Sequence, residues 1–545
     1  MSAGAIGEHG ASVERLGPSW APLVIVAMAQ VLLVFNATAL KVSVDALADS
    51  LGSPASTVKT TIVIYSLVVA TLTILGSKIS VRFGAWAVFR AMIAAFTVSM
   101  VAMALSRSPL TVVASQVAAG VAAAALVPTF VVLVAASYQG ERQAQAMGWL
   151  AAAHSIGIVP ALLIAGALGT WVGWRYTYAL LVLIALLILG LSATLRRNTP
   201  RSEIHMDGVG VLLAACAIFL IGLGCNNLTG WGALTAKPAA PFRLLEMSPA
   251  LPLIALGAVF IKFFLLWSRR LEASGGVPLV ALDVFASKEE RAALLSIFLI
   301  GVIGSAITFV IPLYIEVIQG RNSLYTARAV IPFAVASFVA AIVVVKLRKQ
   351  VHPRLIARYA FACVAFGSAL LGATIHNDWS DSSVLLSMTV AGAGEGALAT
   401  LLFKLLASRK RSADVGSLCG ATDNLAAAVG TSVASALVVG VLAAGVMSEL
   451  ADNPYISEYL RSQVDIDKAS FISNDQLRIR LSNTPATEEE VAEAVRINTL
   501  VRLRSLKICL FTLAVIALFA LLPSAALPDY AEVHEEDPRL TGGSG

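Results

Sequence analysis

The sequence predicts an all-α membrane protein with fourteen transmembrane helices. About fourteen strongly apolar stretches follow one another along the 545 residues, each near the roughly 20 residues that a helix needs to cross a bilayer. Hydrophobic residues make up 58% of the chain and charged residues only 13%, whereas soluble domains average about 25% charged residues. A chain built from spans and short loops indicates a protein that works inside the membrane, and transport is the leading hypothesis.

The predicted spans begin after a polar N-terminal tail. The first is too long for the apolar region of a signal peptide and lacks a strongly basic stretch before it, so we interpret it as a span. In chain order the spans lie near 20–40, 58–76, 86–105, 110–136, 145–168 and 174–195, then 207–228 and 250–267, and finally 291–317, 326–345, 355–375, 384–406, 416–446 and 505–523.

These spans predict three blocks. We expect an N-terminal six-helix bundle over 20–195, two inserted helices over 207–267 and a C-terminal six-helix bundle over 291–523. Within the last block, residues 447–504 form a long polar segment that we expect outside the cytoplasm. Its Thr487-Glu-Glu-Glu490 pattern predicts the capped start of an amphipathic helix that leads into the last span.

Loop charges predict that both termini are cytoplasmic, including the tails 1–19 and 524–545. The last five residues of the second tail, Thr541–Gly545, have the composition of an engineering scar. Lys and Arg are enriched in the short loops on the side of the termini, as the positive-inside rule requires. The net charge of +6 is therefore interpreted as membrane orientation in a cytoplasmic (inner) membrane, and not as nucleic-acid binding. The basic residues of these inner loops are Lys78, Arg82, Arg90, Arg196, Arg197, Arg201, Arg269, Arg270, Lys288, Lys346, Arg348, Lys349, Arg354, Arg409, Lys410 and Arg411.

Motifs of other function classes are absent from the sequence. There is no Gly-Lys dipeptide, so no Walker A loop is present to bind ATP, and neither H-E-x-x-H nor a paired Cys-x-x-Cys motif occurs. Gly392-x-Gly394-x-Gly396 lies inside an apolar span, where it is typical of close helix packing and not of dinucleotide binding. We therefore expect no enzyme activity, no cofactor and no metal.

Short motifs in the middle and second half occur at the spacing of one transporter family. Asp207-Gly-Val-Gly210 opens the seventh span, Trp174-Arg175 opens the sixth, and Pro312-Leu-Tyr314 is followed by Gly320 and Pro332. With these motifs the chain, over about 20–525, resembles the fourteen-helix drug:proton antiporters of the major facilitator superfamily. The resemblance implies two six-helix bundles with two extra helices between them, and substrate bound between bundles that rock against each other.

The first half departs from this family where charged residues are expected. Asn36 stands where the family has a membrane-buried acid, and Gln116 stands where it has an intramembrane Arg. Arg82 and Gly84 remain of the superfamily's gating loop, but its Asp is Val81. Because amides keep hydrogen-bonding capacity without charge, Asn36 and Gln116 are expected either to hold helices together or to contact substrate in the cavity, and not to carry a proton.

Proton coupling then needs other ionisable groups in the spans. Such a group near the bilayer centre costs roughly 2.5–3.5 kcal/mol on insertion scales, so it needs a partner, water or a functional role. Asp423 is the first candidate, and Glu395, which lies among glycines and has Lys404 as a possible ion-pair partner, is the second. His154 is a third because its ring titrates near neutral pH, with a packing role as the alternative.

Further side chains are candidates for the walls of a substrate cavity. Lys41 and Asp45, spaced i,i+4, predict an ion pair at the outer rim or, together with Thr38, one face of an outer vestibule. Glu316, near the outer end of the ninth span, is expected to be solvated. The remaining cavity candidates, for which helix or lipid packing is the alternative, are Tyr65, Thr38, Asn424 and Phe309.

Together these features predict a secondary active transporter that exports amphipathic or lipophilic organic compounds, with proton antiport as one mode of coupling. An alternative is a lipid or natural-product exporter that does not use the family's usual proton site. A second alternative is a membrane sensor or scaffold that no longer transports and uses 447–504 as a docking surface. The expected partners are a small amphipathic substrate, protons and the lipid bilayer, without nucleic acid, and the expected assembly is a monomer.

Overall fold

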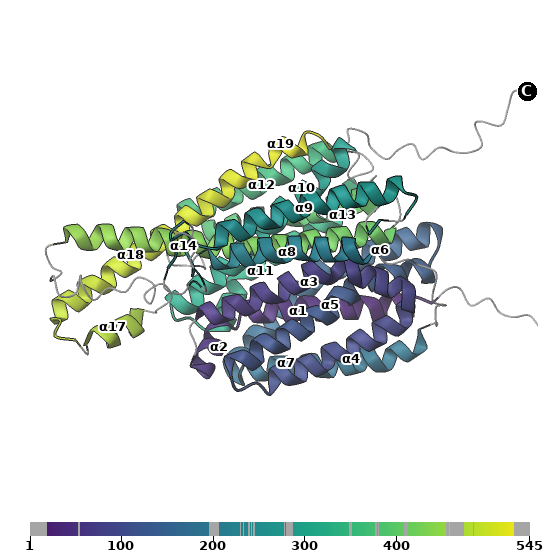
Figure 1. Cartoon of the computed structure of the whole chain (residues 1–545). Helices are drawn as coiled ribbons and strands as arrows, with labels where there is room; N and C mark the ends of the chain where they lie inside the picture. Colours follow the sequence, from purple (N-terminus) through teal and green to yellow (C-terminus); the bar gives the residue numbers. More distant parts are fainter. Residues whose placement is uncertain are drawn as a thin grey trace, which may run out of the picture.

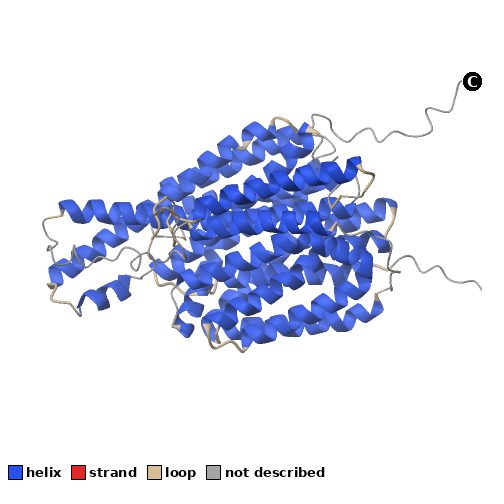
Figure 2. Cartoon of the chain, viewed as in Figure 1, coloured by secondary structure: helices blue, strands red, loops and turns tan. Residues whose placement is uncertain are grey.

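The structure is a computed structural model whose described part is helical (Figure 2). The long helices run side by side and form one elongated bundle (Figure 1). The described residues are 19–52, 55–195, 207–228, 230–232, 234–237, 240, 242, 246–276, 278–279, 287–347, 351–376, 379, 381–407, 412–453, 457, 474–482 and 484–527. The predicted tails, apart from residues 19 and 524–527, lie outside this part of the chain.

The first six helices of transmembrane length form one bundle. Helix α1 packs against α6 and α7, α3 packs against α5, and α4 packs against α5 and α7. Their bounds are α1 (Ala21–Lys41), α3 (Ala55–Phe83), α4 (Ala85–Ala104), α5 (Pro109–Ser137), α6 (Gly140–Trp171) and α7 (Trp174–Leu191), with the short α2 (Val44–Leu51) between α1 and α3 and a 3-10 turn (Ser192–Thr194) after α7.

A second set of six long helices follows in the C-terminal half. Here α13 packs against both α11 and α12, α10 packs against α14, and α18 packs against α12 and α14. The bounds are α10 (Lys288–Leu313), which continues into a π-helical turn (Tyr314–Ile318), then α11 (Ser323–Leu347), α12 (Pro353–Thr374), α13 (Ser382–Ala407), α14 (Ser412–Asp452), α17 (Asn474–Ser482), α18 (Glu488–Phe519) and α19 (Leu521–Ser524).

The two inserted helices, α8 (Gly208–Asn227) and α9 (Ala250–Ala273), pack closely against each other. Glycine permits this approach: a Cβ atom on Gly224 would lie 2.7 Å from the backbone oxygen of Ala250, and one on Gly257 would lie 2.9 Å from that of Ala217. Helix α8 also contacts α3 and α14, one helix from each bundle. The inserted pair therefore covers the seam where α3 meets α14.

Three contacts between the bundles, including this seam, matter for the site. Helix α3 contacts α14, α6 contacts α11, and α1 contacts α10. At the covered seam, Val63, Leu67 and Ala428 are buried together and Ile218 of α8 packs against them. The space between the bundles is therefore bounded by α1, α3 and α6 on one side and by α10, α11 and α14 on the other.

The predicted fold class is confirmed. Thirteen of the described helices are long and apolar enough to cross a membrane, and α6 contributes a further apolar segment, Gly157–Trp171. The glycine motif in α13 also packs as predicted: a Cβ atom on Gly392 or Gly396 would overlap the backbone of α11 at Phe333 or Ser337. Helix α13 can lie this close to its neighbours only because these positions lack side chains.

Helices α14 and α18 extend well past the predicted ends of their spans. Both protrude from one end of the bundle, and α17 packs beside α18 (Figure 1). The predicted capped start of α18 is confirmed: the Thr487 hydroxyl accepts from the Glu490 amide at 3.2 Å, and the Thr487 amide donates to the Glu490 carboxylate at 2.8 Å. The amphipathic helix and the last span are thus one continuous helix. Its placement outside the cytoplasm remains a prediction.

Candidate functional site

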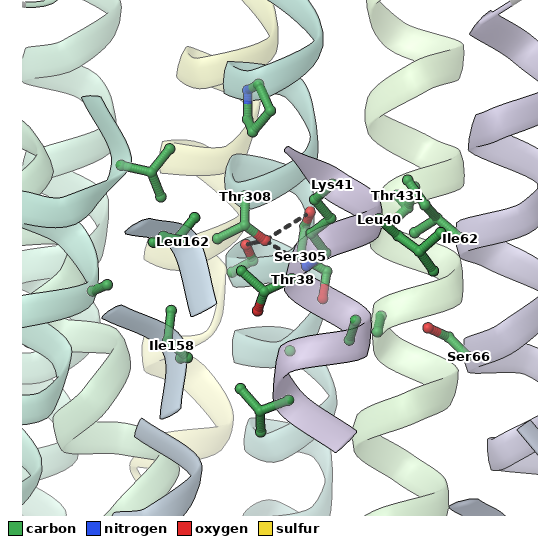
Figure 3. A pocket seen from close by; sticks show the side chains of 18 of the residues that line it. Thr38, Leu40, Lys41, Ile62, Ser66, Ile158, Leu162, Ser305, Thr308 and Thr431 are labelled. Atoms are coloured by element: carbon green, nitrogen blue, oxygen red, sulfur yellow. Dashed lines mark hydrogen bonds between the residues drawn. The ribbon is translucent and has the colours of Figure 1, made fainter. Parts of the chain in front are cut away.

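A cavity of about 200 Å³ lies between the two bundles. Its wall comes from α1, α3 and α6 of the first bundle and from α10, α11, α13 and α14 of the second. Figure 3 shows Thr38 and Lys41 of α1 facing Ser305 and Thr308 of α10, with Ile158 and Leu162 of α6 nearby. The lining combines apolar side chains with a few polar ones, which is the usual composition of a site for a small organic ligand.

Asp423 of α14 and Glu395 of α13 both reach this cavity. Two glycines on one face of α10 leave room for them. A Cβ atom on Gly301 would lie 3.3 Å from the Asp423 carboxylate, and one on Gly304 would lie 3.4 Å from the Glu395 side chain. The structure therefore brings together the first two candidates for proton coupling, which are 28 positions apart in the sequence.

Lys41 lies in the same cavity. Its ammonium group donates a hydrogen bond to the Thr308 hydroxyl at 2.9 Å and interacts electrostatically with Asp423 and Glu395 (Figure 3). The predicted i,i+4 pair with Asp45 on one helix is wrong, because α1 ends at Lys41 and Asp45 belongs to α2. The Asp45 side chain lies outside the described part of the structure. Lys41 thus lines the cavity together with Thr38, and an ion pair with Asp45 at the outer rim stays a prediction.

The other polar groups near the acids have defined partners. The Ser337 hydroxyl of α11 donates to the Glu395 carboxylate at 2.6 Å, whereas the Lys404 side chain lies outside the described residues. The His154 ring of α6 also lines the cavity, and its Nδ1 is 3.1 Å from the Gln30 amide nitrogen. His154 interacts electrostatically with Asp423. All three candidates for proton coupling therefore meet around Lys41.

Asn36 and Gln116 lie outside the cavity wall. Each is fully buried, and their amides exchange two hydrogen bonds, of 3.0 Å from Asn36 to Gln116 and 3.2 Å in return. These bonds join α1 to α5 within the first bundle, which matches the first of the two expected roles, holding helices together. Tyr65, which does line the cavity, also interacts with Asn36. Neither amide lines the cavity, so the alternative role, contact with substrate, stays a prediction.

Of the remaining cavity candidates, two line the cavity and one does not. Thr38 and Asn424 line the cavity, although the Asn424 amide already donates to the Gly420 backbone oxygen at 2.9 Å. Phe309 does not line it: only 1% of its surface is exposed, and it packs in the hydrophobic core. The prediction of Phe309 as a cavity residue is wrong because the rotation of α10 turns this side chain away from the cavity.

The remnant of the gating loop lies at the junction of α3 and α4. Arg82 belongs to the last turn of α3, with its guanidinium carbon 5.7 Å from the centre of the Phe83 ring. Gly84 precedes α4 with a φ of 88°, a backbone conformation that favours glycine. These residues therefore shape a tight helix-to-helix turn and are remote from the cavity lining.

Two charged residues near the start of the α14 and α18 protrusion are buried, which the sequence does not suggest. Glu316 and Arg502 are each only 1% exposed, so the expectation that Glu316 is solvated is wrong. Glu316 lies on the π-helical turn after α10, and Arg502 of α18 interacts electrostatically with Tyr314 of the same turn. In the predicted topology Arg502 lies on the side that the positive-inside rule disfavours, which is the one sequence feature that sets it apart.

The described part of the chain contains no group of three or more His, Cys, Asp or Glu side chains that would hold a metal ion. Between the two bundles lies the partly polar cavity, which Lys41, Glu395 and Asp423 line. This architecture defines a multi-pass membrane protein with a central cavity.

The comparison with known families is consistent with this architecture. The profile of the Major Facilitator Superfamily matches residues 26–435, and the chain belongs to this superfamily. The transporter EfpA of Mycobacterium tuberculosis, described as an uncharacterized MFS-type transporter, is 26% identical over 377 residues, which are 67% of this chain and 66% of that protein. The chain thus matches just under two thirds of the length of EfpA.

A second relative and a solved structure extend the comparison. The cephamycin export protein CmcT of Amycolatopsis lactamdurans is 25% identical over 415 residues, covering 73% of this chain and 80% of that protein. The crystal structure of a bacterial homolog of the human lysosomal transporter Spinster, inward-facing and occupied, aligns with a TM-score of 0.57 at 12% identity and covers 93% of this chain and 96% of that one. This second likeness supports the fold.

Proposed function

We propose that the protein is a secondary active transporter of the multidrug-efflux type, which exports amphipathic or lipophilic organic compounds in exchange for protons. The observation that carries the proposal is the cavity between the two bundles, which contains both apolar side chains and two carboxylic acids. One relative, CmcT, is named for the export of cephamycin, an organic antibiotic. The proposed location is the cytoplasmic (inner) membrane, with both termini cytoplasmic and a monomer as the working unit.

Asp423 and Glu395 are the proposed proton carriers. Both line the cavity, where Asp423 is exposed to the cavity space and Glu395 is partly exposed; among the surrounding apolar helices a carboxylate needs a compensating charge, a hydrogen bond or a proton. The Asn36 and Gln116 pair has no titratable group, so the place of coupling is assigned to the second bundle. His154 faces Asp423 from the first bundle and is the proposed relay between the two sides of the cavity.

Alternating access requires that the bundles move against each other. The proposed moving contacts are those between α3 and α14, between α6 and α11 and between α1 and α10. In such a motion the acids travel with the second bundle, whereas Lys41 and His154 travel with the first. Rocking would therefore change the distance between the opposite charges, which is how substrate and proton binding can be linked to the motion.

The test uses the full-length protein in proteoliposomes, with a pH-sensitive dye inside. A cationic, a neutral and an anionic amphipathic dye (ethidium, Nile red and carboxyfluorescein) are added separately, and proton movement is recorded together with dye uptake. We expect uptake of at least one dye with coupled proton movement, and loss of that coupling in Asp423→Asn. Glu449→Gln, an exposed acid on the same helix, is the matched control.

Two other results would reject the proposal in different ways. Dye transport without proton movement would favour the lipid or natural-product exporter that does not use protons, as the neutral Asn36 and Gln116 pair allows. Absence of transport for all three dyes, with a folded and monodisperse protein, would favour the sensor or scaffold.

A further inference from the structure

The cavity holds one fixed cation and two carboxylic acids. Lys41 is bound to Thr308 on α10, Glu395 is bound to Ser337 on α11, and Asp423 lies beside Gly301 of α10. We propose that Lys41 is an internal counter-ion that neutralises one of the two carboxylates, so that the cavity accepts one positive charge at a time, either a proton or the cationic group of an amphipathic monocation. The inference rests on the proposed function and specifies its substrate class.

The geometry keeps Lys41 in the cavity. It lies in the last turn of α1, where the helix ends, and its ammonium group reaches across the space between the bundles to a hydroxyl of α10. The interaction with Asp423 and Glu395 is electrostatic, so the lysine compensates charge without occupying the hydrogen-bonding positions of either acid. Lys41 is therefore part of the cavity wall in this conformation.

The other groups on the wall do not change this balance. His154 is held by the Gln30 amide, and in its neutral form it contributes no net charge; as a relay it carries the same single proton that otherwise lies on a carboxylate, so the count is unchanged. Cys419, on the same helix as Asp423, is buried. The titratable and charged groups that face the acids from the surrounding helices are Lys41 of α1, Tyr65 of α3, His154 of α6 and Cys419 of α14.

With both acids ionised, the cavity carries one net negative charge beside Lys41. Asp423 is exposed to the cavity space and Glu395 partly so, but apolar helices surround that space, where an unbalanced charge is costly, so the cavity favours one further positive charge. A proton on either carboxylate satisfies this condition, and so does one cationic group on a substrate. Two positive charges, or a dication, leave the cavity with an excess of positive charge.

This balance makes the exchange one for one. A proton from one side binds a carboxylate as the monocation leaves, and on the other side the carboxylate releases that proton to water as the next monocation binds. One positive charge crosses in each direction, so the exchange moves no net charge. Transport of a monocation should therefore respond to a pH gradient and not to the membrane potential.

The closing experiment compares two probes with the same ten-carbon chain, decyltrimethylammonium with one charge and decamethonium with two. Proteoliposomes containing the full chain and a pH-sensitive dye report proton movement when each probe is added. In the unmodified protein we expect proton exchange with decyltrimethylammonium and exchange about tenfold or more weaker with decamethonium. An imposed membrane potential should leave the first rate unchanged.

The variants test the charge count directly. Lys41→Gln removes the counter-ion, so decamethonium should gain exchange by about tenfold or more relative to decyltrimethylammonium. In Asp423→Asn the charges of Lys41 and Glu395 cancel, so this variant should lose monocation exchange. In the double variant Lys41→Gln/Asp423→Asn, Glu395 again leaves one net negative charge, so monocation exchange should return. Lys346→Gln, an exposed lysine in the last turn of α11, is the control that removes a lysine away from the cavity.

The outcomes separate this inference from the proposed function. If the unmodified protein exchanges protons for one of the dyes of the earlier test but not for decyltrimethylammonium, the inference is overturned and the proposed function stands. If it moves no protons with any of these compounds, proton exchange itself is rejected and the inference with it. If the unmodified protein exchanges protons for decyltrimethylammonium but Lys41→Gln keeps the same preference between the probes, only the counter-ion role is overturned. If Lys41→Gln does not fold, the double variant still decides: a folded double variant without monocation exchange overturns the charge count.

Discussion

Asn36 and Gln116 face each other inside the first bundle and exchange two amide hydrogen bonds, with neither side chain exposed. Each amide satisfies the hydrogen-bonding group of the other that faces it. The two residues lie on different helices and are 80 positions apart in the sequence. A charged pair at this position would have had to overcome the desolvation of both ions. The amide pair joins α1 to α5 without that cost and without a titratable group.

Removal of one partner of this pair should destabilise the protein more than removal of both. Asn36→Leu or Gln116→Met alone leaves a buried amide without its partner, which costs about 1–3 kcal/mol, whereas two apolar side chains of similar volume can be nearly neutral. We expect the double variant to unfold at a higher temperature than either single variant in detergent. Additive losses would show that the two amides act independently.

Close packing at α13 should not tolerate even one methyl group. A Cβ atom on Gly392 or Gly396 would overlap the backbone of α11, so Gly392→Ala and Gly396→Ala should each destabilise the protein by about 1–3 kcal/mol. Gly440→Ala on α14 is the control, because a Cβ atom there meets nothing within 4 Å and alanine favours the helix. Thermal unfolding of the purified protein measures all three, and equal effects would contradict the packing argument.

The Asp207-Gly-Val-Gly210 motif has a structural explanation that can be tested. The Asp207 carboxylate accepts from the Gly210 amide at 2.8 Å, which caps α8, and from the Trp267 ring nitrogen of α9 at 2.9 Å. Asp207→Ala should therefore cost about 0.5–2 kcal/mol and loosen the inserted pair.

Matched glycine variants provide the control for this cap. Gly210→Ala places a methyl group against the Asp207 carboxylate and should also destabilise, whereas Gly208→Ala meets nothing within 4 Å. Both are measured by thermal unfolding beside Asp207→Ala. If Gly208→Ala is destabilised, or if Gly210→Ala is not, the hydrogen bond between the Gly210 amide and the Asp207 carboxylate is not what stabilises this motif.

The tie between α14 and α18 should depend on pH. Glu493 precedes the apolar segment of α18 that begins at Ser505, and two hydrogen bonds of 2.7 Å from Arg496, joined by one of 2.7 Å from Asn453, hold the pKa of the Glu493 carboxyl at about 2. The ordinary pKa of a glutamate carboxyl is about 4.3. The stability that the ionised Glu493 gives the folded protein is therefore complete above about pH 4.3 and is lost as the pH falls through about 2.

Hydrogen exchange can measure this contribution. In Glu493→Gln the first turns of α18 should be less protected than in the unmodified protein at about pH 6, and this difference should shrink toward about pH 2. Glu489→Gln, an exposed acid in the first turn of α18, should show no such difference. A difference that stays constant over this pH range would exclude the carboxylate as its cause.

Much of the site could be anticipated from single residues. Asp423, Glu395 and His154 are conspicuous because ionisable side chains are costly in an apolar span, and the structure brings all three to one cavity. The spacing of Lys41 and Asp45 predicts a rim pair or, with Thr38, one face of a vestibule. Thr38 and Lys41 do share the cavity wall, but α1 ends at Lys41, which no local pattern shows. Phe309 was misplaced for a related reason: residue type does not fix the rotation of a helix.

The sequence by itself determined the number of spans and the fold class, because the length of an apolar stretch is set by the thickness of the bilayer and by the need to pair every backbone group within a helix. It also showed that the first bundle lacks the charges of its family. Only the tertiary structure decided that Lys41 faces Asp423 and Glu395, and that Arg502 and Glu316 are buried. Those facts depend on helix rotation and on contacts between distant segments, which arise from packing and not from local composition.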